Sequence, residues 1–281
     1  MNSNFKKITA VNQLAFKQAF PGLRGVDIFA HQYPIEPFLV FTEYYMDKPV
    51  FGPHPHAGIS VLTYMLPDSK ESFINRDSNG DFSTIEPGGL HITQAGSGIH
   101  HDEFPTGNGH QAHGFQIWIN HTEKDRMVEP KAIHANANQV KEVHLPTATV
   151  RILHGAFQHE RTTYQLKTDV ILLHVIIKPN QSITLDAKEM AFVYTLTGNG
   201  TIGDTNLRPQ QLINFSEEGT SIKLGAGPEG LSLMFASAEP LHEPIVYGGP
   251  FVMTTNEQMN ETKRNYAAGK MGHLAPYQIK K

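Results

Sequence analysis

The sequence predicts an all-β protein that consists of two antiparallel β units in tandem, closed by one short C-terminal helix. Apolar and polar residues alternate in short segments that Gly, Pro, Asn or Asp separate every ten residues or so, a pattern typical of half-buried strands and tight turns. The pattern occurs in both halves of the 281-residue chain and is interrupted by a polar stretch near the middle. This length allows two small domains with a core each.

Four segments of the first half have the alternation expected of strands: residues 38–45, 60–66, 89–94 and 114–120. Between the second and third of them, Asp77-Ser78-Asn79-Gly80 separates two apolar runs. Asn-Gly is the dipeptide that most readily takes the left-handed conformations of a two-residue hairpin turn. The sequence therefore predicts a β-hairpin at this point.

The stretch from His121 to Leu145 lacks strand alternation, contains Pro130 and runs into Pro146. It fits a linker with room for a short helix. We therefore expect an N-terminal domain at residues 1–125, a linker at 126–145 and a C-terminal domain, which includes the tail, at 146–281.

The second half resumes the strand pattern and ends in a helix. Its predicted strands are residues 150–153, 170–177, 182–186, 192–196, 211–215, 221–224 and 231–236. Near the end of the chain, Thr255 and Gln258 have the spacing of a capping box, which predicts a helix that begins there. The apolar stripe of that helix is Met259, Thr262 and Tyr266, and Gly269 is its stop signal.

Composition excludes several functional classes. Lys and Arg number 23 against 27 Asp and Glu, for a formal net charge of -4, so no basic footprint for direct nucleic-acid binding is expected. There are no cysteines, so disulfides, thiolate metal sites and thiol catalysis are excluded. No apolar run approaches the roughly 18 residues of a membrane helix, and the N-terminal residues lack the apolar region of a signal peptide. We expect a cytoplasmic protein that does not enter the membrane.

Histidine is unusually frequent in this otherwise ordinary composition. The chain has 16 histidines, and most of them precede residue 145. His54 and His56 are two residues apart, a spacing that places both side chains on one face of a strand, roughly 7 Å apart at Cα. His101 and Glu103 repeat the spacing after the turn Ala95-Gly96-Ser97-Gly98-Ile99. Two such strands would enclose a divalent ion. Three imidazoles and one carboxylate leave it two open octahedral positions and suit Fe, Mn, Co, Ni or Cu(II), with Zn also possible.

Other histidines compete for this assignment. His91 lies on a candidate strand after Pro87-Gly88-Gly89-Leu90 and could turn toward the same cavity. Alternation places His100 and Asp102 on the face opposite His101 and Glu103, so His100 is expected behind the ligands or at the surface. The surface or the pocket rim is expected to hold three more: His110, His113 and His121. The predicted strand at 182–186 has no histidine, so no metal is expected in the second domain.

Taken together, these motifs resemble the pirin family, a two-domain group of the cupin superfamily. The resemblance extends over most of the chain and rests on Pro37-Phe38-Leu39, His54-Pro55-His56, Gly58, Thr63-Tyr64, Asp77-Ser78, Gly80, Pro87-Gly88, the run from Ala95 to Glu103, Gln116 to Asn120, Glu243-Pro244, Gly249 to Met253, and Tyr266. It implies two cupin-type, jelly-roll-like β-barrels face to face. It also implies one metal ion, usually iron, in the N-terminal barrel, held by the positions of His54, His56, His101 and Glu103.

The chain departs from the family pattern close to these ligands. Ala57 and Ser60 replace a usual Arg and Glu, Asn75 replaces a His, Gly89 an Asp, and Ile92 a Trp. The ligand positions are retained while the expected pocket wall differs.

The family resemblance implies an oxidoreductase of the flavonol (quercetin) 2,3-dioxygenase type as the leading hypothesis. A small enolic aromatic substrate and O2 would use the open metal positions, and Glu103 would be both ligand and catalytic base. Two alternatives remain open: a metal- or redox-sensing regulator that binds a protein partner, and a metal-dependent isomerase or hydrolase on the same scaffold.

Overall fold

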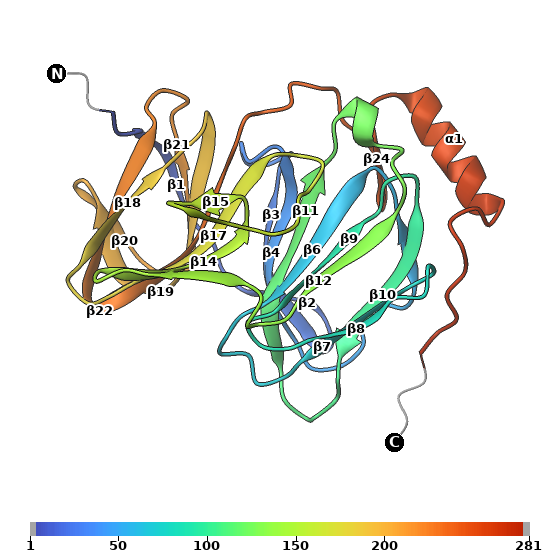
Figure 1. Ribbon diagram of the computed structural model, residues 1–281, viewed down its shortest axis with the longest axis horizontal. Helices are drawn as coiled ribbons and strands as arrows, with labels where there is room; N and C mark the ends of the chain where they lie inside the picture. The colour runs from blue at the N-terminus through green and yellow to red at the C-terminus, as the bar shows by residue number, and fades with distance from the viewer. Residues whose placement is uncertain (1–3, 278–281) are drawn as a thin grey trace.

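The structure is a computed structural model that describes residues 4–277, and it confirms two β-barrel domains with one C-terminal helix. Figure 1 shows the barrels side by side, with α1 (Asn256–Ala267) on the outer side of the N-terminal barrel. In the described part of the chain, none of the helices has the length and apolar character of a membrane span.

The N-terminal barrel is formed by two antiparallel sheets. The larger sheet has the order β12 (Lys131–Ala135), β9 (Leu90–Gln94), β6 (Ile59–Met65), β11 (Ala112–Asn120), β4 (Phe38–Met46), β3 (Leu23–Phe29) and β2 (Lys17–Phe20). The smaller sheet has the order β5 (His54–His56), β10 (Ile99–Pro105), β7 (Phe73–Asp77) and β8 (Phe82–Ile85).

The C-terminal barrel is built on a nine-stranded sheet. Its main path is β1 (Ile8–Gln13), β21 (Gln211–Phe215), β19 (Met190–Ile202), β22 (Ser221–Ala238), β17 (Val170–Ile177), β14 (Ala148–His154) and β13 (Lys141–His144). Beside this path, β18 (Ser182–Asp186) pairs with β22 and β20 (Thr205–Leu207) pairs with β19. The smaller elements are the hairpins β15 (Ala156–Phe157) with β16 (Glu160–Arg161) and β23 (Val246–Gly248) with β24 (Phe251–Met253), and a 3-10 turn at Glu123–Asp125.

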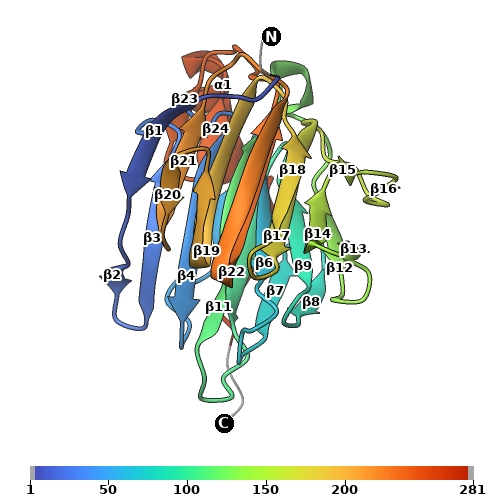
Figure 2. The ribbon, with the colours of Figure 1, turned by 90° about the vertical axis from the view of Figure 1, so that its left-hand side faces the viewer.

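The strands that join the barrels are buried on both faces. On β6, Thr63 faces the interior of the N-terminal barrel, whereas Leu62 and Tyr64 belong to a core shared with the C-terminal barrel. In that core the ring of Phe41 lies 5.1 Å from the ring of Phe192. Apolar side chains from both halves therefore form one continuous core. In Figure 2 the C-terminal barrel lies in front of the N-terminal barrel.

The structure corrects two expectations from the sequence. The segment 126–145 is not a linker without strands, because it contributes β12 to the N-terminal sheet and β13 to the C-terminal one. Each is a short edge strand whose side chains are mostly exposed or half-buried, so the burial pattern is weak. The segments 221–224 and 231–236 form one long strand, β22, whose middle contains three glycines and pairs with a bulged part of β19. We propose that the domain boundary lies between β12 and β13.

The chain ends also cross between the domains. β1, expected in the N-terminal domain, pairs with β21 of the C-terminal sheet, and the N-terminal end lies beside that barrel in Figure 1. Conversely, β24 and α1 pack on the N-terminal barrel, where Phe251 forms a bridge with Ala57. The predicted capping box of α1 is present, with the Thr255 side chain accepting from the Gln258 backbone N–H.

The predicted hairpin joins β7 and β8, but four residues rather than two separate the strands. The Asp77 carboxylate accepts backbone N–H groups from Asn79 at 2.8 Å and Asp81 at 3.0 Å. Gly80 takes the left-handed conformation, with φ of 97°. The side chain of Asp77 thus stabilises a wider turn than Asn-Gly alone would form.

Candidate metal centre

Two neighbouring strands bring three of the predicted ligands together. β5 pairs antiparallel with β10 in the register His101 opposite His54 and Ile99 opposite His56. Alternation along each strand turns the three imidazoles to the inside of the barrel. Their candidate ligand atoms all lie within 4.8 Å of one another.

Hydrogen bonds at the Nδ1 atoms orient these imidazoles. His54 Nδ1 lies 2.9 Å from the Gly52 carbonyl oxygen, His56 Nδ1 3.2 Å from the Pro250 carbonyl oxygen, and His101 Nδ1 3.3 Å from Asn75 Oδ1. A backbone carbonyl can only accept, so Nδ1 of His54 and His56 carries the proton and Nε2 keeps its lone pair. The Nε2 atoms of His54 and His101 are 3.1 Å apart. With His101 also protonated on Nδ1, two lone pairs face each other at that distance and favour a cation between them.

Burial keeps the imidazoles neutral. It lowers the pKa of His56 to about 3 and the pKa of His101 well below its ordinary value, and the neighbouring imidazoles add to both effects. Metal ligation requires this neutral form. The chemistry and orientation of the three side chains therefore fit a divalent transition metal.

Glu103 lies beside the three imidazoles but is not one of the group within 4.8 Å. Its Oε2 is 3.9 Å from His101 Nε2 and accepts a hydrogen bond of 2.7 Å from Gln116 Nε2, while Thr63 donates to Oε1. Burial raises the pKa of Glu103 to about 7, against the lowering effect of these hydrogen bonds. Ligation by Glu103 stays a prediction.

The site opens into an apolar cavity of about 740 Å³. His54, His56 and Glu103 line it together with Gln116 and Trp118 of β11. The remaining wall is largely aromatic and aliphatic and includes Phe20, Leu23, Phe29, Leu39, Val40, Tyr44, Met46, Phe51, Phe73 and Tyr247. An apolar cavity with a few polar groups at one end is suited to a flat organic ligand.

A segment of the C-terminal half completes the site. The chain around β23 and β24, residues 246–253, which we call the strap, supplies the Pro250 carbonyl to His56 and lines the cavity with Tyr247, Gly249 and Pro250. Arg126, fully buried, donates to the Val252 carbonyl at 3.3 Å and to Thr254 Oγ1 at 2.7 Å. The N-terminal site is therefore built from both halves of the chain.

Gly58, two residues after His56, allows the strap to lie close to the backbone that follows β5. Its φ is 80°, and a Cβ atom there would lie 1.9 Å from the Val252 carbonyl oxygen. Gly58→Ala is expected to lower the free energy of unfolding by more than about 1 kcal/mol and to weaken metal binding, because the strap must shift away from His56. Denaturant unfolding and metal titration measure the two effects.

Gly109→Ala is the matched control for this prediction. Gly109 has a similar φ of 86°, but no atom lies within 4 Å of the position of its Cβ. Its replacement carries the same backbone strain without displacing the strap. Equal metal affinity in the Gly58→Ala variant and the wild type would contradict a role for the strap in the site.

The remaining sequence candidates lie elsewhere. His91 is not part of the imidazole group, because its Nε2 is bonded to Asn75 Nδ2 at 2.9 Å. His100 lies on the opposite face of β10 as predicted, buried below Tyr266 at a ring distance of 5.4 Å. His110 is exposed as expected.

The expectation that His113 and His121 lie at the surface or rim is wrong. His113 is buried and bonded to Glu43 at 2.8 Å, and His121 is buried and bonded to Ser60 Oγ at 2.8 Å. Both carry a polar partner from a neighbouring strand, which single-sequence alternation does not reveal.

The departures from the family pattern are not in the cavity wall. The cavity lining contains none of Ala57, Ser60, Asn75, Gly89 and Ile92. Ala57 contacts the strap, and Ser60 is hydrogen-bonded to His121. Ile92 belongs to the core between the barrels. Only Asn75 contacts a ligand imidazole directly. The expectation of an altered pocket wall is therefore wrong at these positions.

The sequence analysis did not assign a role to the residues that support the ligands. Thr63 and Gln116 on the inner faces of β6 and β11 hold Glu103, and Pro250 comes from far along the chain. Alternation could have placed Thr63 and Gln116 on the inner face. No local pattern indicates the contact of Pro250.

Comparisons with known proteins match this architecture. The pirin model matches residues 16–119, and the model of the pirin C-terminal cupin domain matches residues 172–272. A pirin-like protein of Arabidopsis thaliana is 31% identical over 253 residues, 85% of this chain and 80% of that protein.

Solved structures share the fold. A quercetin 2,3-dioxygenase of Acinetobacter baumannii has a TM-score of 0.86 at 24% identity and covers 96% of this chain and 100% of its own. The bacterial pirin YhhW of Escherichia coli, in complex with nickel(II), has a TM-score of 0.67 at 17% identity over 82% of this chain and 99% of its own. With both cupin domains matched in order, this chain belongs to the pirin family.

Proposed function

We propose that this protein is a mononuclear metal-dependent oxidoreductase of the quercetin 2,3-dioxygenase type, with iron as its metal. The observation that carries the proposal is an apolar cavity of about 740 Å³ that His54, His56 and Glu103 line, with the third convergent imidazole, His101, beside them. A solved structure with the same fold carries that activity in its name.

His54, His56, His101 and Glu103 would hold the metal. A bound divalent transition metal supplies a Lewis acid for an enolate oxygen and one-electron chemistry toward O2. Because His54, His56 and Glu103 line the cavity, a small molecule in the cavity would be able to reach a metal held by these side chains.

The chain's own residues prepare the substrate. The aromatic wall of the cavity, with Trp118 beside His56 at a ring distance of 4.8 Å, would orient a flavonol or a similar enol with its hydroxyl toward Glu103. Glu103 would take the hydroxyl proton. Thr63 and Gln116 hold its two oxygens in place and leave the carboxylate directed to the end of the cavity.

Oxygen consumption by metal-loaded protein tests this proposal across a panel of flavonols. Glu103→Gln keeps the side-chain volume but removes the base, so turnover is expected to fall by roughly 10²- to 10⁴-fold. Glu229→Gln, the same change at an exposed position in the C-terminal barrel, serves as the control.

The metal content decides how a negative result is interpreted. Stoichiometric metal without oxygen consumption on any flavonol would contradict the proposed reaction while leaving the metal centre intact. Turnover without O2 would indicate an isomerase or hydrolase instead.

A further inference from the structure

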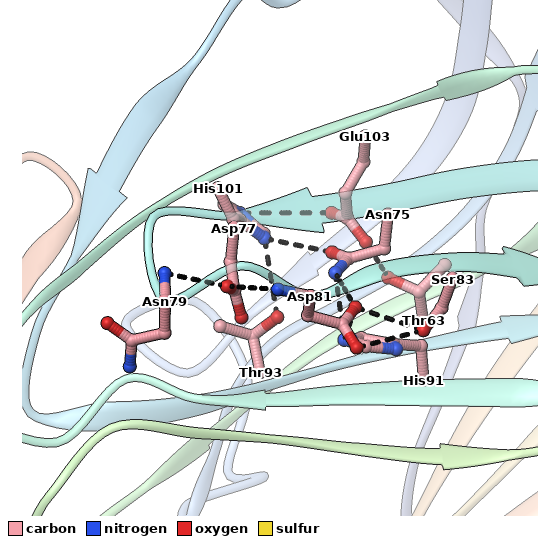
Figure 3. A network of polar contacts seen from close by, with 10 residues as sticks. All are labelled: Thr63, Asn75, Asp77, Asn79, Asp81, Ser83, His91, Thr93, His101 and Glu103. Atoms are coloured by element: carbon pink, nitrogen blue, oxygen red, sulfur yellow. Dashed lines mark hydrogen bonds and ion pairs between the residues drawn. The ribbon is translucent and has the colours of Figure 1, made fainter. Parts of the chain in front are cut away.

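Asn75 of β7 connects the ligand His101 to a polar network that includes buried His91 and half-buried Asp81, shown in Figure 3. Its Oδ1 lies 3.3 Å from His101 Nδ1, and its Nδ2 lies 2.9 Å from His91 Nε2 and 3.4 Å from Asp81 Oδ2. The Asn75 side chain is fully buried, so water does not replace these partners. One amide therefore contacts two imidazoles and one carboxylate.

We propose that Asp81 and Asn75 are positioning residues that fix the tautomer of His101, and thereby direct its Nε2 lone pair to the metal. This inference rests on the proposed metal centre but not on the proposed reaction.

The direction of the hydrogen bonds around Asn75 follows from its neighbour Asp81. The Asp81 carboxylate accepts hydrogen bonds, so the NH2 group of the Asn75 amide must face it. The amide oxygen then faces His101, which must donate from Nδ1. The same NH2 group donates to His91 Nε2, so the proton of His91 lies on Nδ1.

Without the carboxylate, the network could run in either direction. A His91 protonated on Nε2 could donate to the amide oxygen, and the amide NH2 could then donate to His101 Nδ1. In that arrangement His101 would carry its proton on Nε2 and could not ligate. Asp81 allows only one of these two directions. Hydrogen-bond partners of metal-bound imidazoles commonly fix the tautomer in this way.

The hairpin between β7 and β8 holds Asp81 in place. Its backbone N–H donates to Asp77 at 3.0 Å, and Ser83 Oγ donates to its carboxylate at 3.0 Å. The segment Asp77-Ser78-Asn79-Gly80, predicted only as a turn, thus orients a metal ligand through Asp81 and Asn75. This also assigns a role to Asn75, one of the departures from the family pattern.

Imidazole nitrogen NMR of the metal-free protein, labelled with ¹⁵N-histidine, tests the proposal directly. In the wild type, His101 is expected to be protonated on Nδ1 and unprotonated on Nε2. Asp81→Ala is expected to give both tautomers, and nickel(II) affinity should fall by at least about twofold as the competent fraction falls. Asp204→Ala, the same change at an exposed position of the C-terminal barrel, is the control and should retain the wild-type tautomer.

Two changes at Asn75 separate positioning from structural support. Asn75→Leu removes the acceptor and should weaken nickel(II) binding by about 10- to 100-fold. The paired change Asn75→Asp with Asp81→Asn places an acceptor beside both imidazoles and an amide donor where the Asp81 carboxylate was, so it should preserve the tautomer and the affinity of His101 while moving the proton of His91 to Nε2. Thermal unfolding of each variant shows whether it folds, and Asp81→Ala tests the proposal if Asn75→Leu does not.

A single wild-type tautomer of His101 in both Asp81→Ala and a folded Asn75→Leu would overturn the proposal. Loss of dioxygenase activity with an unchanged tautomer would instead count against the proposed function alone.

Discussion

His56→Ala is expected to abolish metal binding, so that protein purified without a histidine tag contains metal only at background. His56 is one of three imidazoles that converge on one point, and within residues 4–277 no fourth imidazole belongs to this group. The variant would retain His54, His101 and the predicted ligand Glu103, whose carboxylate lies outside the group within 4.8 Å, so the site would lose one of its three converging nitrogens. Elemental analysis against protein concentration measures the effect.

His110→Ala is the matched control, because it removes an exposed imidazole outside the site and should leave the metal content unchanged. Glu103→Ala tests the carboxylate, and we expect loss of stoichiometric metal there too. Full metal content in His56→Ala would contradict the assigned ligand set and make His91 the next candidate.

Phe41→Ala is expected to lower the free energy of unfolding by about 3–5 kcal/mol. The Phe41 side chain is fully buried, and its ring contacts Phe38, Phe115 and Phe192, with centroid distances between 5.1 and 6.4 Å. Because these rings come from both barrels, the cavity would weaken the core that joins them. Chemical denaturation followed by fluorescence and circular dichroism measures the loss.

Phe82→Ala removes the same side chain at an exposed position and should change stability by less than about 0.5 kcal/mol. If Phe41→Ala cost no more than this control, the contact between the barrels would not be a stabilising core. We also expect both barrels of the wild type to unfold in one transition, since they share that core.

The sequence predicted the architecture wherever one residue in two faces the core. The spacing of His54 with His56 and of His101 with Glu103 was sufficient to place these side chains on inner faces, because alternation is a local property of strands. The antiparallel pairing of β5 with β10 then brought His54 opposite His101.

Contacts between distant segments were beyond the reach of local patterns. Nothing near Pro250 indicates that its carbonyl binds His56, and β1 carries no sign that it joins the C-terminal sheet. The two short strands within 126–145 carry no clear alternation, because at the edges of their sheets most of their side chains are half-buried or exposed. Asn75 was noted only as a departure, since its role depends on Asp81 and His91 on two other segments.

X-ray absorption spectroscopy of the metal-reconstituted protein tests the central claim most directly. The account predicts a first coordination shell with scattering from three imidazoles, together with oxygen ligands from one carboxylate and from exchangeable solvent. A shell of four or more imidazoles would contradict a metal centre that is open to the cavity. So would a shell without an exchangeable oxygen ligand, that is, one that does not change when a flavonol binds.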